Sequence, residues 1–147
     1  GVTCVDCHMP YERAGSVKVT NHWIRSPLRN INNACQTCHK WSEEELTNRV
    51  KTIQDRVYET MVKSESAIVD AINAIKAAKD AGATDEQLKE ARKLHRRAQL
   101  RWDFVAAENS MGFHSPQETL KTLSNAIDYA RQSQLAAERL MRNLAVK

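Results

Sequence analysis

The sequence has few of the residues that usually build an apolar core or a long loop. Aromatic residues account for 5% of its 147 positions, and it contains four glycines and three prolines. With few aromatic side chains, the chain has little apolar surface to bury in a core, because these side chains bury the largest surfaces. Few glycines and prolines leave little room for turns, because these residues dominate turns. We therefore expect a single, mostly helical domain, as the chain length also indicates.

Long hydrophobic runs and a strong excess of one charge are also lacking. No stretch approaches the roughly 20 apolar residues that a membrane-spanning helix needs. The formal net charge is +4, and the basic residues are interspersed with acidic ones, which is typical of solvated helix surfaces and not of nucleic-acid binding. The chain begins with Gly1 and shows no signal peptide. We expect that processing removed a leading segment or that the chain is a piece of a longer protein.

The four cysteines are confined to two short motifs. Residues 4–8 and 35–39 both have the pattern C-x-x-C-H, the attachment signature of a c-type haem. Two cysteines three apart lie on one face of a helical turn, so that each can form a thioether to one vinyl group of the same porphyrin, and the following histidine points at the iron. We predict two covalently attached haem c groups. The thioether sites are Cys4, Cys7, Cys35 and Cys38, and the proximal iron ligands are His8 and His39.

Paired cysteines also serve other purposes. Four thiolates can bind zinc, but the separation of Cys7 from Cys35 exceeds the usual spacing of about 15–20 residues, and zinc needs no histidine after each pair. A thioredoxin-like redox pair needs a βαβ context, which the sequence does not show. Two structural disulfides are a third alternative. A zinc-stabilised helical interaction module remains the rival of another class, and it predicts a colourless protein that a chelator unfolds.

Two haems would change what the composition implies. The buried macrocycles would supply the core that the side chains do not, so that the apoprotein should fold poorly. Four propionate carboxyls would bring the positive net charge near neutral, which removes any charge argument for nucleic acid. Because covalent haem attachment takes place outside the cytoplasm, we expect a periplasmic or otherwise extracytoplasmic protein.

Three long helices are predicted from residue 42 onward. Apolar residues recur at steps of three and four residues over about 42–79, 84–110 and 116–144. Each helix begins with a capping box, at residues 42–45, 84–87 and 115–118, and Gly82 suits the C-terminal cap of the first. Short connections make neighbouring helices antiparallel.

The predicted fold is all-α, that of a multihaem c-type cytochrome. An irregular dihaem-binding segment, residues 1–41, with a loop over 11–33, precedes a segment of three long antiparallel helices, residues 42–147, and both form one structural unit. The first helix outruns the second by several turns, so that some of its apolar surface is left for another subunit. We expect a homodimer through the long helices.

The remaining histidines are candidates for distal iron ligands. His114 lies at a helix–helix turn between Gly112 and a Ser-Pro cap, which would hold it rigidly, and we predict that it ligates a haem iron. His22 is predicted to do the same from the loop. His95 lies mid-helix beside two arginines, and we expect it to be solvated. Met111 is disfavoured as a thioether ligand because a histidine follows three residues later.

Bis-histidine ligation would leave no open coordination position, so that such haems transfer electrons and do not bind substrate directly. Two nitrogen ligands also give lower reduction potentials than a Met/His pair. The sequence shows no catalytic constellation of its own, and it therefore predicts an electron-transfer unit.

The order and spacing of these residues resemble the C-terminal part of pentahaem cytochrome c nitrite reductase, the ammonia-forming enzyme that reduces nitrite with six electrons. The resemblance covers essentially the whole chain. It is carried by residues 4–11, His22, residues 26–28, residues 35–39, and the long helices interrupted at residues 112–116.

The resemblance implies a ligand map. His8 and His114 would be the proximal and distal ligands of the family's fourth haem, and His39 the proximal ligand of its fifth. His22 would reach the second haem, whose attachment motif is absent here. The partners implied are redox proteins or the haem-bearing remainder of a parent enzyme.

The family's active-site C-x-x-C-K motif and its calcium site do not occur in this chain. Catalysis would therefore belong to residues outside the chain, and octahaem cytochromes share much of this core. The first rival is a self-contained dihaem electron carrier, in which His22 or His95 supplies the sixth ligand to the haem on Cys35 and Cys38.

Overall fold

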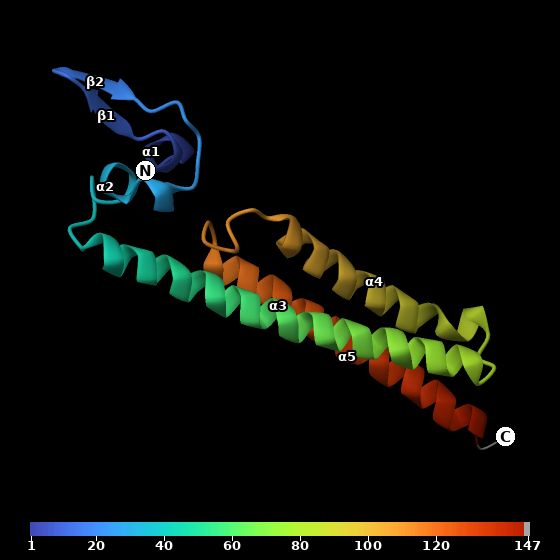
Figure 1. The fold of residues 1–147 in the computed structure, drawn as a ribbon. Coiled ribbons are helices and arrows are strands. Elements are labelled where there is room, and N and C mark those ends of the chain that lie inside the picture. Colours follow the sequence, from blue (N-terminus) through green and yellow to red (C-terminus); the bar gives the residue numbers. More distant parts are fainter. Residues whose placement is uncertain (146–147) are drawn as a thin grey trace. The chain divides into compact units, whose positions relative to one another are not determined.

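Most of the chain is helical, as predicted. The computed structural model describes residues 1–145, which form helices and one small two-stranded sheet. Contacts divide the chain into two compact units, Gly1–Thr52 and Ile53–Lys147. Helix α3 (Glu43–Asp80) begins next to the predicted boundary at residue 42 and contributes residues to both units (Figure 1).

The first unit consists of short elements with little apolar packing. They are α1 (Cys4–His8), β1 (Tyr11–Ala14), β2 (Val17–Thr20), the 3-10 helix η1 (Pro27–Arg29) and α2 (Ile31–Ala34). Its buried side chains are Pro10, Ile31 and Ala34. Side chains alone therefore give this unit a very small core.

A β-hairpin corrects the sequence prediction of a loop over residues 11–33. Strands β1 and β2 pair antiparallel, with Tyr11 opposite Thr20 and Ala14 opposite Val17. Gly15 connects them with φ of 64°, because a two-residue hairpin turn needs a positive φ that glycine adopts without strain. The strands have four residues each and are mostly exposed, so that their alternation of side chains gives only a weak signal in the sequence.

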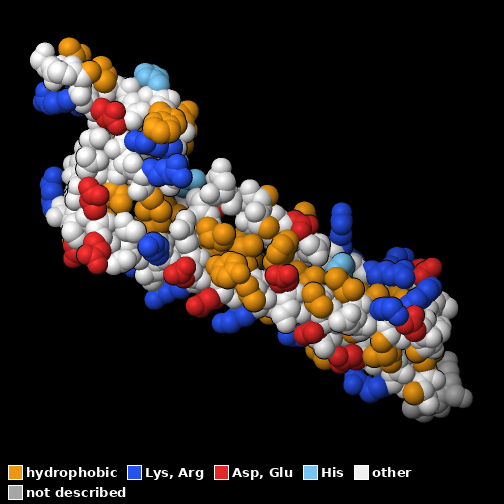
Figure 2. All heavy atoms as spheres, viewed as in Figure 1, with side chains coloured by type: hydrophobic (Ala, Val, Ile, Leu, Met, Phe, Trp, Pro, Cys, Tyr) orange, Lys and Arg blue, Asp and Glu red, His pale blue; other side chains and the backbone are white. Residues whose placement is uncertain are grey.

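The second unit packs the C-terminal part of α3 against α4 (Asp85–Ala107) and α5 (Pro116–Ala145). The three helices are antiparallel neighbours, as predicted (Figure 1). One core cluster joins Val57, Val105 and Leu123 near the turn between α4 and α5. Another joins Ala78, Leu88 and Ala137 near the turn between α3 and α4. Figure 2 shows charged side chains of both signs interspersed along the exposed surface of these helices.

Small residues bring the helices close together. Between those two clusters, Ala67 and Ala71 of α3 pack with Ala98 of α4 and Ala130 of α5. Two polar contacts join the same helices. The Ser133 hydroxyl donates to the Ala91 carbonyl at 2.7 Å, and the indole Nε1 of Trp102 donates to the Met61 carbonyl at 3.3 Å.

The helix ends confirm two of the three predicted capping boxes. At the start of α3, the Ser42 N–H and hydroxyl donate to the Glu45 carboxylate at 2.9 and 2.7 Å. At the start of α4, Thr84 and Gln87 form the equivalent pair. Helix α5 begins at Pro116, as predicted, and the Glu118 carboxylate lies 3.4 Å from the Lys121 ammonium.

The end of α3 is also as predicted. Gly82 has a φ of 96°. Its N–H donates to the Lys79 carbonyl, and the N–H of Ala83 donates to the Ala78 carbonyl, both at 3.0 Å. These two bonds define a Schellman motif. Among the described residues, no helix is long and apolar enough to cross a membrane.

Candidate functional site

The first C-x-x-C-H motif forms helix α1. Asp6 accepts hydrogen bonds from the hydroxyl and the N–H of Thr3, both at 2.7 Å, and these bonds hold the pKa of Asp6 below its usual value. The helical turn places Cys4 and Cys7 three residues apart, on one face. Both thiols are free, with Cys4 exposed and Cys7 partly buried. This is the arrangement that two thioethers to one porphyrin require.

His8, the predicted proximal ligand, is oriented by the backbone. Its Nδ1 lies 3.0 Å from the carbonyl oxygen of Arg25. Because a carbonyl can only accept, the hydrogen bond places the ring proton on Nδ1 and the lone pair on Nε2. Iron-ligating histidines commonly have this second hydrogen bond, which fixes the tautomer and the ring orientation.

The second motif follows α2 as a continued turn. Cys35 caps α2, and its carbonyl accepts from the N–H groups of Cys38 and His39 at 3.2 and 2.9 Å. The imidazole of His39 stacks on the indole of Trp41, with ring centroids 5.2 Å apart. Gln36 donates to the Trp41 carbonyl at 2.9 Å, so that the segment beyond the motif is folded back beside it.

The thiols of the two motifs influence one another. Burial raises the pKa of Cys7, and the charges of Asp6 and Cys38 raise it further. Burial also raises the pKa of Cys35, with a contribution from Cys7. Helix α1 also contacts α2, so that the attachment sites predicted for two different haems lie close together within the first unit.

A cavity of about 1120 Å³ lies beside the second motif. Cys35, Cys38 and His39 line it, together with Val5 and Asp6 of the first motif. Its volume is slightly above the roughly 300–1,000 Å³ of typical ligand pockets, so that it has room for a group as large as a porphyrin. The free thiols, the adjacent imidazole and the size of the cavity fit a covalent haem.

Apolar side chains are exposed around the motifs. Trp23, Ile24 and Trp41 are each more than half exposed, as is Val5 within the first motif. A bound macrocycle would cover such side chains and supply the apolar surface that this unit lacks. This exposure is a second reason why the first unit fits haem.

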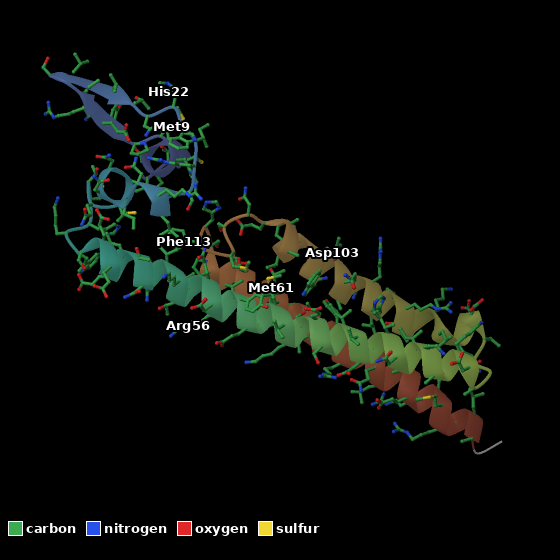
Figure 3. All side chains as sticks on the ribbon, in the orientation of Figure 1. Met9, His22, Arg56, Met61, Asp103 and Phe113 are labelled. Carbon is green, nitrogen blue, oxygen red and sulfur yellow. The ribbon has the colours of Figure 1, made fainter. Side chains whose placement is uncertain are left out.

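His22, the predicted ligand from the loop, lines the same cavity. Figure 3 shows it on the segment after β2, with Met9, another cavity-lining residue, at the end of α1. The preceding Asn21 donates to the Glu12 carboxylate at 2.6 Å and accepts from the N–H of Trp23 at 2.8 Å. Asn21 thus ties the segment that contains His22 to the hairpin.

His114 belongs to the second unit, whereas both motifs and His22 belong to the first. It lies in the turn between α4 and α5, where Met111 and Gly112 both have positive φ. Its Nδ1 is 3.1 Å from the Glu108 carboxylate, and the Ser110 hydroxyl accepts from its N–H at 3.0 Å. The turn holds His114 through both its ring and its backbone.

Glu108 was not identified from the sequence. Its carboxylate accepts from the N–H and hydroxyl of Ser110 and from the N–H of Gly112, at 2.8–3.0 Å. Burial alone would raise the pKa of Glu108, but these hydrogen bonds and His114 bring it below its usual value. The only signal in the sequence is a carboxylate six residues before a histidine, across a glycine turn, which is too common to be specific.

The expectation that His95 is solvated is wrong. His95 is half-buried in α4, and its Nε2 is buried with no hydrogen-bond partner in the described part of the chain. Burial, with the charge of Arg96, lowers its pKa. The packing of α4 in the bundle turns this position inward. The two arginines that follow His95 in the sequence had indicated an exposed position instead.

The structure gives the zinc alternative no support. Within residues 1–145, no three histidine, cysteine, aspartate or glutamate side chains are grouped so that they could hold a metal ion.

A model of the cytochrome c552 family matches residues 1–147. A cytochrome c-552 from Parabacteroides distasonis is 44% identical over 98% of this chain, and one from Bacteroides thetaiotaomicron is 44% identical over 96%. The chain spans 29% of the length of each of these relatives. A solved structure of cytochrome c nitrite reductase from Desulfovibrio desulfuricans covers 94% of this chain with a TM-score of 0.85 and 35% identity, and 30% of that chain is matched.

Proposed function

Because this chain belongs to the cytochrome c552 family, we propose that it is a dihaem c-type electron-transfer unit, resembling part of cytochrome c nitrite reductase. The observation that carries the proposal is the pair of C-x-x-C-H turns in one small unit. Each turn presents two free thiols and a histidine. Residues of both motifs line one cavity, which supports the exchange of electrons between the two proposed cofactors.

The cysteines are proposed to attach the haems, and the histidines to ligate their irons. Haem c supplies a one-electron iron centre when it is attached. Cys4, Cys7, Cys35 and Cys38 would attach two such groups, and His8, His39, His114 and His22 would be the iron ligands. Where two histidines ligate one iron, no position would stay open for substrate, and the role of these side chains would be to hold the iron geometry constant while its charge changes. Little reorganisation then opposes electron transfer.

Nitrite reduction would belong to a larger assembly. This chain has no C-x-x-C-K motif, so that it would pass electrons to or from an active site in other residues. A redox partner protein or a haem-bearing companion segment is the implied partner. We also place the protein outside the cytoplasm and expect a homodimer through the long helices.

Haem stoichiometry tests the central claim. After maturation in a competent host, the protein should contain two haems per chain, measured as pyridine haemochrome and by intact mass. Replacing both Cys35 and Cys38 by alanine should leave one haem. A colourless, zinc-containing protein, or an alanine variant that still contains two haems, would contradict the proposal.

Ligand binding tests the assignment of His114. His114→Ala in the haem-loaded protein should open one iron to carbon monoxide, with a shift of its Soret band. His95→Ala is the matched control, because it also removes an imidazole from the second unit. It should leave the haem absorption spectrum unchanged. If His114→Ala binds no carbon monoxide, His114 is not a ligand, and a response of His95→Ala would move the role to His95.

A further inference from the structure

The turn that contains His114 is organised around one carboxylate. Glu108 follows the last residue of α4. It accepts from the N–H of Ser110 at 2.9 Å and from its hydroxyl at 2.8 Å, and from the N–H of Gly112 at 3.0 Å. The carboxylate therefore satisfies backbone donors on a segment that includes two residues with positive φ. This side chain therefore helps to fix the path of the backbone up to His114.

The same carboxylate contacts the imidazole of His114. One oxygen of Glu108 lies 3.1 Å from His114 Nδ1. An ionised carboxylate can only accept, so that this bond places the ring proton on Nδ1 and the lone pair on Nε2. His8 has the same tautomer, but its partner is the neutral carbonyl of Arg25. The two predicted ligands thus differ in the charge of the group behind the ring.

The turn is also anchored to a neighbouring helix. The Gln54 amide of α3 donates to the Ser110 carbonyl at 3.0 Å. Gly112 packs so closely on α3 that a Cβ at this position would lie 2.7 Å from Val57 Cγ2. These contacts fix the backbone of the turn, whereas Glu108 contacts both the backbone and the His114 ring.

We propose that Glu108 is the positioning residue of His114. It keeps Nδ1 protonated, leaves the Nε2 lone pair available to an iron, and makes the imidazole a stronger donor through a charge-assisted hydrogen bond. A stronger donor stabilises the ferric state, so that Glu108 lowers the reduction potential of the haem that His114 ligates. This inference rests on the proposed role of His114 as an iron ligand.

The central variant is Glu108→Gln in the haem-loaded protein. Glutamine can still accept from Ser110 and Gly112, but its uncharged amide cannot provide a charge-assisted bond to Nδ1–H. In a spectroelectrochemical titration, one haem should shift to a higher reduction potential while the other stays unchanged. In the diamagnetic ferrous state, the Nδ1 proton of His114 should exchange with solvent faster than in the wild type, as measured by NMR.

Two controls separate positioning from simpler effects. Glu118→Gln removes one negative charge close by in sequence, from an exposed side chain paired with Lys121. Gln54→Ala removes a different hydrogen bond to the same turn without touching the imidazole. Both should leave the two potentials and the Nδ1 exchange rate unchanged. A shift of equal size in Glu118→Gln would mean a general charge effect, and one in Gln54→Ala would mean a structural effect, and either result would overturn the proposal.

The test distinguishes this inference from the ligand assignment. If His114→Ala opens a haem to carbon monoxide but Glu108→Gln changes neither the potential nor the proton exchange, His114 remains a ligand and the role of Glu108 is refuted. If His114→Ala has no effect on the spectrum, the assignment itself fails and the inference fails with it.

Discussion

At the scale of the residue, Gly112 and Gly82 have similar backbones in different surroundings. Both have positive φ, 79° and 96°. A Cβ on Gly112 would collide with Val57 and lie 3.1 Å from Thr119 Cγ2, whereas a Cβ on Gly82 would meet nothing within 4 Å. Gly112 is therefore needed for its conformation and for its lack of a side chain, and Gly82 only for its conformation.

This difference predicts unequal costs for the same substitution. Gly82→Ala should lower the free energy of unfolding by about 1–2 kcal/mol, the cost of a left-handed alanine. Gly112→Ala should cost about 1–3 kcal/mol more, because overpacking adds to that strain, and it should displace His114. Denaturant titration of both variants in the haem-loaded protein gives the difference, and equal costs would show that the contact with Val57 relaxes freely.

The sequence predicts site residues only where the residue type itself carries the chemistry. Cys4 and Cys7 are recognisable because two thiols and a following histidine are a rare combination. Glu108 and the Arg25 carbonyl are not, because their roles depend on where the backbone turns. The orientation of an imidazole is a tertiary property, so that the partners of His8 and His114 became visible only in the structure.

At the scale of the element, helix ends are the most predictable features. The Ser42 and Thr84 boxes and the Gly82 cap depend on hydrogen bonds between residues three to five apart, so that the local sequence contains all the necessary groups. The hairpin of β1 and β2 was missed because its exposed strands bury little surface. Apolar periodicity indicates only those elements that pack against a core.

The Ser42 box should make the start of α3 sensitive to pH. The hydrogen bonds from the Ser42 hydroxyl and N–H lower the pKa of Glu45 below its unfolded value. The stabilisation is therefore present above the unfolded pKa and is lost as pH falls through the folded pKa. The protection factors of the amides of residues 43–46, which are corrected for the pH dependence of intrinsic exchange, should fall at acid pH in the wild type.

Ser42→Ala is the control for this pH effect. It removes the hydroxyl while keeping Glu45 and the two other acidic residues of the first turn, Glu43 and Glu44. The variant should fray at neutral pH and show a smaller loss of protection on acidification. The same pH dependence in both proteins would mean that Glu43 and Glu44, interacting with the helix dipole, account for it.

At the scale of the whole molecule, the two units differ in what stabilises them. Ile53–Lys147 contains three apolar clusters, with side chains such as Leu88 and Leu123 fully buried. Gly1–Thr52 buries three side chains and has a cavity of about 1120 Å³. Haem should therefore contribute most of the apolar core of the first unit and little of that of the second.

Preventing haem attachment should separate the units. With all four cysteines replaced by alanine, the helical unit should keep its far-ultraviolet circular dichroism and its amide protection, because side chains alone build its apolar clusters. Residues 1–41 should lose protection in hydrogen exchange measured by mass spectrometry. The sequence alone led us to expect that the whole apoprotein folds poorly. We now expect this of the first unit only. Loss of protection along α4 and α5 as well would show that the two units fold together and that haem stabilises both.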